Sequence, residues 1–204
     1  MHSFFDAMTP WPRNDGSLHV YALPDDDVVD RLFAASEPLD GIAALPRMPR
    51  AWLHFTVGRL AQFDDLGQAG LTRLADELGG ALASIAAFDL QVGPPEVWGQ
   101  SVNCSAEPSA AWDGLVAAVR AGAAAFADEP LPPAPHEPHV SLAYATGEVA
   151  DDVVRARLAG ASAVGSVGVQ RVHLVSVTVR PEVGTFDWTE LANWDLKGDA
   201  EESG

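Results

Sequence analysis

Two tetrapeptides, His54-Phe55-Thr56-Val57 and His139-Val140-Ser141-Leu142, each combine an imidazole with a hydroxyl two residues later. Because side chains alternate between the two faces of a strand, the histidine and the hydroxyl of each motif would share one face, about 7 Å apart. The apolar residues between them would anchor the opposite face. If the two strands lie side by side, two imidazoles and two hydroxyls would line one groove.

These groups suit acid–base chemistry at a phosphate ester. A histidine titrates at about pH 6.5, so at neutral pH one ring can act as the base and the other as the acid. The hydroxyls of Thr56 and Ser141 can donate to the non-bridging phosphate oxygens, where charge develops. The motifs therefore predict that His54 and His139 are catalytic, with no metal and no cofactor. The acidic character of the chain should raise the pKa values of both histidines.

The segments that would carry these motifs alternate between strands and helices. Hydrophobic alternation and β-branched residues predict strands over residues 18–23, 52–57, 88–92, 97–104, 138–144 and 172–179. Apolar residues at helical spacing predict helices over residues 28–33, 71–85, 109–126 and 151–158. Gly93-Pro94-Pro95 is expected to turn the chain. The order predicts an α+β fold with two similar halves, each of which approaches its histidine strand through prolines.

Length and composition indicate one globular domain. The chain has 204 residues, of which 48% are hydrophobic and 20% charged, so it can bury a core. We expect residues 1–17 to form an irregular N-terminal lead-in, residues 18–196 a single bilobal domain and residues 197–204 a flexible acidic tail.

The charge balance and the single cysteine narrow the class of partner. With 12 basic and 29 acidic residues the formal net charge is −17, which repels duplex DNA and long RNA. The lone Cys104 excludes an internal disulfide and a multi-cysteine zinc site. The sequence has no secretory signal and no run of about 18 apolar residues, so we expect a cytoplasmic protein without a membrane partner.

The paired motifs, with their hydrophobic flanks, resemble those of the 2H phosphoesterase superfamily, which includes bacterial 2′-5′ RNA ligase-like proteins and cyclic nucleotide phosphodiesterases. The resemblance spans roughly Leu18 to Leu196. It implies an α+β, bilobal fold in which two pseudo-twofold-related lobes place antiparallel sheets around a central groove, with the helices outside. It also implies that His54 and His139 are the general acid and base, and that Thr56 and Ser141 bind phosphate.

One residue departs from the pattern of several RNA-processing relatives. Tyr144 stands five residues after the second histidine, where those relatives have an arginine. The loss of that cation argues against a polyanionic RNA substrate. The resemblance and the charge together predict a metal-independent phosphodiesterase, acting as a monomer on a small nucleotide or short oligonucleotide. Its substrate would be a 2′,3′-cyclic phosphate or a related cyclic or 2′-5′-linked ester, and 2′-5′ RNA ligation would be the reverse reaction.

Two other classes of function remain open. A nucleotide- or phosphate-binding module could keep the groove without turnover, although binding alone does not require two titratable rings. A metal-dependent hydrolase could use His136, His139 and His173, but Pro138 prevents the helix that a zinc-binding histidine pair needs.

Other side chains near the motifs are further candidates for the groove. We expect its walls to include Tyr144, His19, Tyr21 and His136. One of four arginines could meet a phosphate, with a solvated surface position as the alternative: Arg47, Arg50, Arg59 and Arg171. Five tryptophans could stack on a nucleobase or pack in the core: Trp11, Trp52, Trp98, Trp188 and Trp194.

Overall fold

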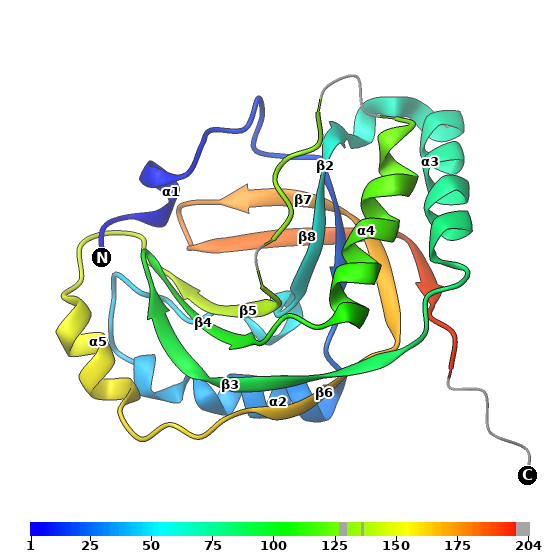
Figure 1. Cartoon of the computed structure of the whole chain (residues 1–204). Helices are drawn as coiled ribbons and strands as arrows, with labels where there is room; N and C mark the ends of the chain where they lie inside the picture. Colours follow the sequence, from blue (N-terminus) through cyan, green and yellow to red (C-terminus); the bar gives the residue numbers. More distant parts are fainter. Residues whose placement is uncertain (127–129, 136, 199–204) are drawn as a thin grey trace, which may run out of the picture.

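A computed structural model, which describes residues 1–126, 130–135 and 137–198, contains one curled antiparallel sheet (Figure 1). Its eight strands are ordered β6-β3-β4-β5-β2-β1-β7-β8. Their bounds are β1 (Ser17–Ala22), β2 (Phe55–Phe63), β3 (Phe88–Trp98), β4 (Ser101–Ala106), β5 (His139–Tyr144), β6 (Gly165–Val169), β7 (Arg171–Arg180) and β8 (Thr185–Asp195).

The sheet consists of two four-stranded halves, β6-β3-β4-β5 and β2-β1-β7-β8. They meet where β2 lies antiparallel to β5, through the residue pair Phe55 and Val140. The expected α+β fold with two antiparallel halves is thus confirmed, with the added finding that the halves form one continuous sheet. Each half contributes one of the two histidine motifs to this junction.

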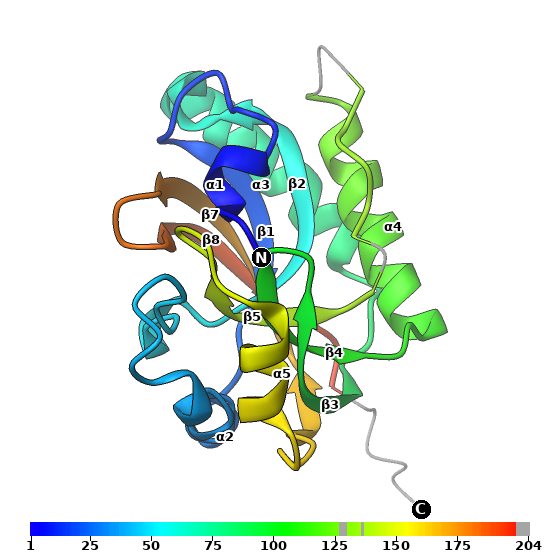
Figure 2. The ribbon, with the colours of Figure 1, turned by 90° about the vertical axis from the view of Figure 1, so that its left-hand side faces the viewer.

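Helices cover the convex side of each half (Figures 1 and 2). α3 (Gly67–Leu82) and α4 (Ala110–Ala124) lie side by side behind the β2 half, and α2 (Asp26–Ala35) and α5 (Asp151–Leu158) lie behind the β5 half. The short α1 (Phe4–Ala7) lies near the groove side. Three 3₁₀ turns complete the helical elements: Glu37–Leu39, Arg50–Trp52 and Asp64–Leu66. The described helices are each too short or too polar to span a bilayer.

Local sequence signals explain where the helices begin and which face they bury. The side chain of Asp25 accepts a hydrogen bond from the backbone N–H of Val28 at 2.8 Å, which caps α2. Ser109 caps α4 in the same way. In α3 the residues Leu74, Leu78 and Leu82 recur every four positions and are buried against the sheet.

The expected turn at Gly93-Pro94-Pro95 is wrong, because β3 runs through these residues to Trp98 and the chain reverses at Gly99, whose φ is +53°. β6 pairs with β3 only as far as Val92, so this part of β3 has one free edge. Prolines are tolerated at a free edge, where their missing N–H groups are not needed.

Two strands and several strand boundaries differ from the sequence-based expectation. β4 begins at Ser101 rather than at Val97, because Val97 and Trp98 belong to β3. Neither β6 nor β8 was expected, since β6 is glycine-containing and β8 is an edge strand with many exposed polar residues. β2 begins at Phe55 rather than at Trp52, because residues Arg50–Trp52 form a 3₁₀ turn. His54 therefore stands directly before its strand, while His139 is the first residue of its own.

Candidate active site

The two motifs lie next to each other at the junction of the sheet halves. Phe55 pairs with Val140, and continuing this antiparallel register by one residue places His54 opposite Ser141 and Thr56 opposite His139. All four side chains then share the concave face. Directly opposed residues have Cβ atoms about 5 Å apart, and the two histidines, which are diagonal neighbours, about 7–8 Å.

Both imidazoles are held in the same way by the backbone. Nδ1 of His54 lies 2.7 Å from the carbonyl oxygen of Trp52, and Nδ1 of His139 lies 3.0 Å from that of Glu137. A carbonyl only accepts, so Nδ1–H is the donor in each ring. In a neutral ring this leaves Nε2 with a free lone pair, which is the form that a general base requires.

His54 is buried, with 9% of its surface exposed. Burial lowers its pKa from 6.5 to about 4; the hydrogen bond to Trp52 opposes this change and the charge of His139 adds to it. The ring of Tyr21 stacks on His54, with centroids 3.8 Å apart and an interplanar angle of 16°. His54 is therefore neutral at pH 7, contrary to the expectation that the acidic chain would raise its pKa, because loss of solvation outweighs the distant carboxylates.

A β-bulge follows the first motif. Tyr21 of β1 pairs with Thr56, but the preceding residue of β1 pairs with Gly58, so Val57 is an extra residue in β2. An extra residue reverses the alternation of side chains. Arg59, five residues after the histidine, consequently faces the groove together with Thr56, and both line the same cavity.

The second motif has a bulge at the equivalent position. Ser141 pairs with Asn103 of β4, but Ala143 pairs with the residue before it, so Leu142 is an extra residue in β5. Tyr144, again five residues after the histidine, is thereby brought to the groove face. Burial raises the pKa of Tyr144, while a hydrogen bond with Ser141 opposes this change.

A cavity of about 270 Å³ opens on the β1–β2 side of the motifs. Its wall includes His54 and Thr56 and three of the groove candidates from the sequence, Tyr144, His19 and Tyr21. The other residues of the wall are Phe4, Met8, Thr9, Trp11, Arg59 and Phe186. Neither His139 nor Ser141 lines this cavity. The fourth candidate, His136, lies outside the described residues.

His19 is a wall residue of this cavity whose two ring nitrogens are both engaged. Nδ1 lies 3.1 Å from the hydroxyl of Tyr21, and Nε2 lies 3.3 Å from that of Ser17. Burial, followed by the charges of Arg59 and His54, lowers its pKa to about 3. Its ring is therefore a neutral hydrogen-bonding residue rather than a proton donor at pH 7.

A second hollow, of about 310 Å³, lies beside His139. Ser105, which pairs with His139, and Glu137, whose carbonyl accepts from it, belong to the wall. The ring of Trp98 lies 5.5 Å from that of His139. Glu96 and Glu107 complete the charged part of the wall, so this side of the site is acidic.

The four candidate arginines, which the sequence alone could not distinguish as phosphate ligands, have different surroundings. Arg47 pairs with Asp40, Arg50 with Asp30 and Arg171 with Asp195. Only Arg59 of the four lines the cavity beside His54. Strict alternation would have placed Arg59 on the opposite face from Thr56, so the bulge that turns it inward could not be predicted from the sequence pattern.

Asn103 is a groove residue that the sequence did not indicate. It lies opposite Ser141 with 3% of its surface exposed. Within the described part of the chain, its side-chain oxygen has no hydrogen-bond partner. No pattern in the sequence distinguishes this asparagine from those in turns.

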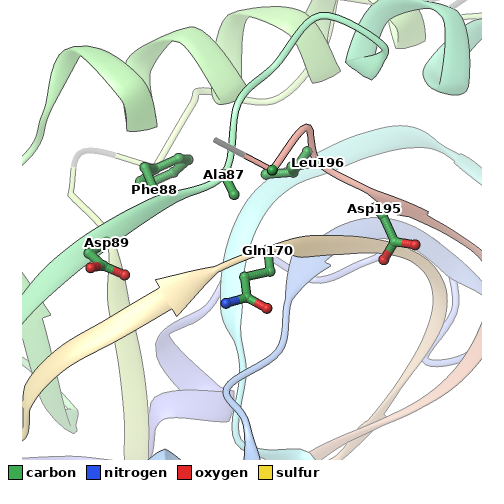
Figure 3. A pocket seen from close by; sticks show the side chains of 7 residues that line it. Ala87, Phe88, Asp89, Gln170, Asp195 and Leu196 are labelled. Carbon is green, nitrogen blue, oxygen red and sulfur yellow. The ribbon is translucent and has the colours of Figure 1, made fainter. Parts of the chain in front are cut away.

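The last histidine considered as a metal ligand, His173, and a larger cavity lie away from the motifs. His173 is on β7, three strands from His139, so the two are about 14 Å apart and cannot share a metal ion. Its Nδ1 lies 2.5 Å from a carboxylate oxygen of Glu190. A cavity of about 540 Å³ lies where β3 begins and β8 ends. Figure 3 shows Asp89, Gln170 and Asp195 in its wall. Neither motif contributes to it.

Residues 28–180 match the family model of the 2′-5′ RNA ligase superfamily, which is three quarters of the chain. The chain belongs to the 2′-5′ RNA ligase superfamily. These proteins are 2H phosphoesterases, so the resemblance seen in the sequence is confirmed and phosphoesterase-type enzyme chemistry is supported. No curated protein sequence matches the chain.

Solved structures share the fold of this superfamily member at low sequence identity. TT0787 of Thermus thermophilus superposes with a TM-score of 0.73 at 18% identity, over 90% of this chain and 99% of its own. E. coli LigT complexed with NADP+ has a TM-score of 0.68 at 16% identity, over 89% of this chain and 98% of its own. E. coli LigT complexed with 3′-AMP has a TM-score of 0.66 at 16% identity, over 90% of this chain and 99% of its own.

Proposed function

We propose that this chain is a metal-independent phosphodiesterase that hydrolyses a small nucleotide ester, a 2′,3′-cyclic phosphate or a related cyclic or 2′-5′-linked ester. One observation carries the proposal. His54 and His139 come from the two halves of the sheet, and each donates Nδ1–H to a carbonyl and keeps Nε2 for the substrate. A binding site alone would not need two rings oriented in this way.

The burial of His54 assigns it the role of base in this proposal. With a pKa of about 4 it is unprotonated at neutral pH and can accept a proton from water at Nε2. The water oxygen forms a bond to phosphorus, and the bond from phosphorus to the leaving ribose oxygen breaks. His139, protonated at Nε2, donates its proton to that oxygen. Thr56 and Ser141 donate to the non-bridging oxygens as their charge grows.

A nucleotide substrate is supported by the surroundings of the motifs and by the relatives. Aromatic residues border both imidazoles, Tyr21 on His54 and Trp98 beside His139, and aromatic faces can stack on nucleobases. E. coli LigT has been crystallised with NADP+, 3′-AMP and ATP. The net charge of −17 favours a small substrate over long RNA, and makes 2′-5′ ligation the weaker direction.

The test is hydrolysis of the four nucleoside 2′,3′-cyclic phosphates with and without EDTA. We expect turnover that resists EDTA and falls by about 10²–10⁴-fold in His54→Ala and in His139→Ala. His2→Ala, at an exposed position that lines neither of the two hollows, is the matched control and should keep full activity. Tight binding without product would instead favour a nucleotide-binding module, and loss of activity in EDTA would contradict the metal-independent mechanism.

A further inference from the structure

The cavity beside His54 contains a guanidinium that has no counter-ion among the described residues. Arg59 lines the cavity, and its Nε is buried without a hydrogen-bond partner among the residues that the structure describes. Within that same part of the chain no carboxylate lies within 4.0 Å of it. Arg47, Arg50 and Arg171, the other three candidate arginines, each have one. A partly buried cation in this position is available to an anion from solution.

The position of Arg59 separates it from the phosphate that reacts. Thr56 pairs with Tyr21 and Arg59 pairs with His19, so Arg59 lies two ladder positions, about 7 Å, farther along the strands. Its guanidinium lies over the ring of Trp11, 4.8 Å from the centroid, rather than beside the motif. The charge of Arg59 helps to lower the pKa of His19, whereas the charge that helps to lower the pKa of His54 is that of His139.

The hollow on the other side of the motifs disfavours a phosphate. Glu96, Glu107 and Glu137 form part of its wall, and their carboxylates repel an anion. The two sides of the site therefore differ in charge although their strands and bulges are equivalent. A substrate with a phosphate at one end can bind in only one direction, with that phosphate toward Arg59.

We propose that Arg59 and Thr9 form a subsite for a second phosphate of the substrate, one that is not hydrolysed. Building on the proposed function, this makes the preferred substrate a nucleotide that carries a 5′-phosphate in addition to the 2′,3′-cyclic ester. The separation of about 7 Å between Thr56 and Arg59 along the strands is comparable to the distance across one ribose. Two adjacent phosphates of a diphosphate would be too close to occupy both positions.

The experiment compares adenosine 2′,3′-cyclic phosphate with and without a 5′-phosphate. We expect the wild-type protein to prefer the 5′-phosphorylated substrate about 10- to 100-fold in kcat/KM, the range of a charge-assisted contact. Arg59→Met should abolish this preference, so that kcat/KM becomes equal for the two substrates. Arg59→Lys should keep part of the preference, and Arg171→Met, whose arginine pairs with Asp195, should keep all of it.

Two kinetic results would overturn the subsite. One is a wild-type protein without the preference; the other is an equal loss of kcat on both substrates in Arg59→Met, which would place Arg59 on the reacting phosphate. A binding measurement separates this outcome from failure of the proposed function. By calorimetry, the wild-type protein should bind adenosine 3′,5′-bisphosphate at least about tenfold more tightly than 3′-AMP, and Arg59→Met should bind the two equally. This holds whether or not turnover occurs, and equal wild-type affinities would also refute the subsite.

Discussion

The acidic limb of the pH–rate profile should report the burial of His54. The difference between its ordinary pKa of 6.5 and the value of about 4 in the folded protein corresponds to about 3 kcal/mol in favour of the neutral ring. If His54 is the base, kcat/KM should show no acidic limb near pH 6.5. It should instead fall, tenfold per pH unit, below about pH 4.

Exposing the imidazole of His54 to water should shift the acidic limb of the pH–rate profile to higher pH. Tyr21→Leu removes the aromatic ring that stacks on His54 at 3.8 Å and lets water solvate the imidazolium. The pKa should then rise toward 6.5, and the limb should move up by about one pH unit or more. Tyr21→Phe is the matched control: it keeps the stacked ring and loses only the hydroxyl that lies near His19, so its limb should stay near that of the wild type.

Two measurements check this reasoning: initial rates across the acidic range, and NMR titration of the His54 ring. A wild-type His54 that titrates near 6.5, or identical limbs in both variants, would refute it. The wild-type titration decides the question even if Tyr21→Leu does not fold.

The burial of His54 also affects the stability of the protein. The unfolded chain binds the proton at about pH 6.5 and the folded protein only at about 4, so the free energy of unfolding should decrease as the pH falls through this interval.

Other consequences of the structure can be measured separately. Thr56→Val and Ser141→Ala should each lower kcat by about 10²-fold with little change in unfolding free energy, as expected for donors to the transition state; an unchanged kcat would exclude that role. Gly80→Ala, in open space within α3, should stabilise the protein by about 1 kcal/mol in urea unfolding, whereas the Cβ of Gly79→Ala would lie 2.7 Å from an indole nitrogen of β8 and should cancel that gain. Cys104, whose pKa burial raises to about 12, should react with aromatic disulfides only after unfolding.

Much of the helical structure and the two-faced pattern of the first motif follow from local signals. Asp25 and Ser109 are side chains that cap helices, and the structure has helices beginning directly after both. The alternation in His54-Phe55-Thr56 correctly separates an apolar face from a polar one, since Phe55 is buried in the core. These features depend on neighbours within a few residues, so the sequence carries them directly.

Features that depend on the ladder between strands could not be predicted. Pro94 and Pro95 look like a turn until the free edge of β3 is known. Arg59 and Tyr144 reach the groove because β2 and β5 each contain one extra residue. The family resemblance leads us to expect Tyr144 there, but nothing in the sequence fixes the register that creates those bulges. The shielding of His54 likewise depends on Tyr21, which is 33 positions away in the chain.

The packing behind the junction between the halves of the sheet determines the spacing of the two histidines. The side chains that join β2 to β5 point away from the groove, and Phe55 packs there against Trp112 of α4, with ring centroids 6.5 Å apart. The distance between His54 and His139 is thus set from behind the groove, by the volume of apolar side chains in the interior. In the proposed mechanism, a change of one or two methylene groups at Phe55 or Val140 would impair proton transfer while every group that touches the substrate stays the same.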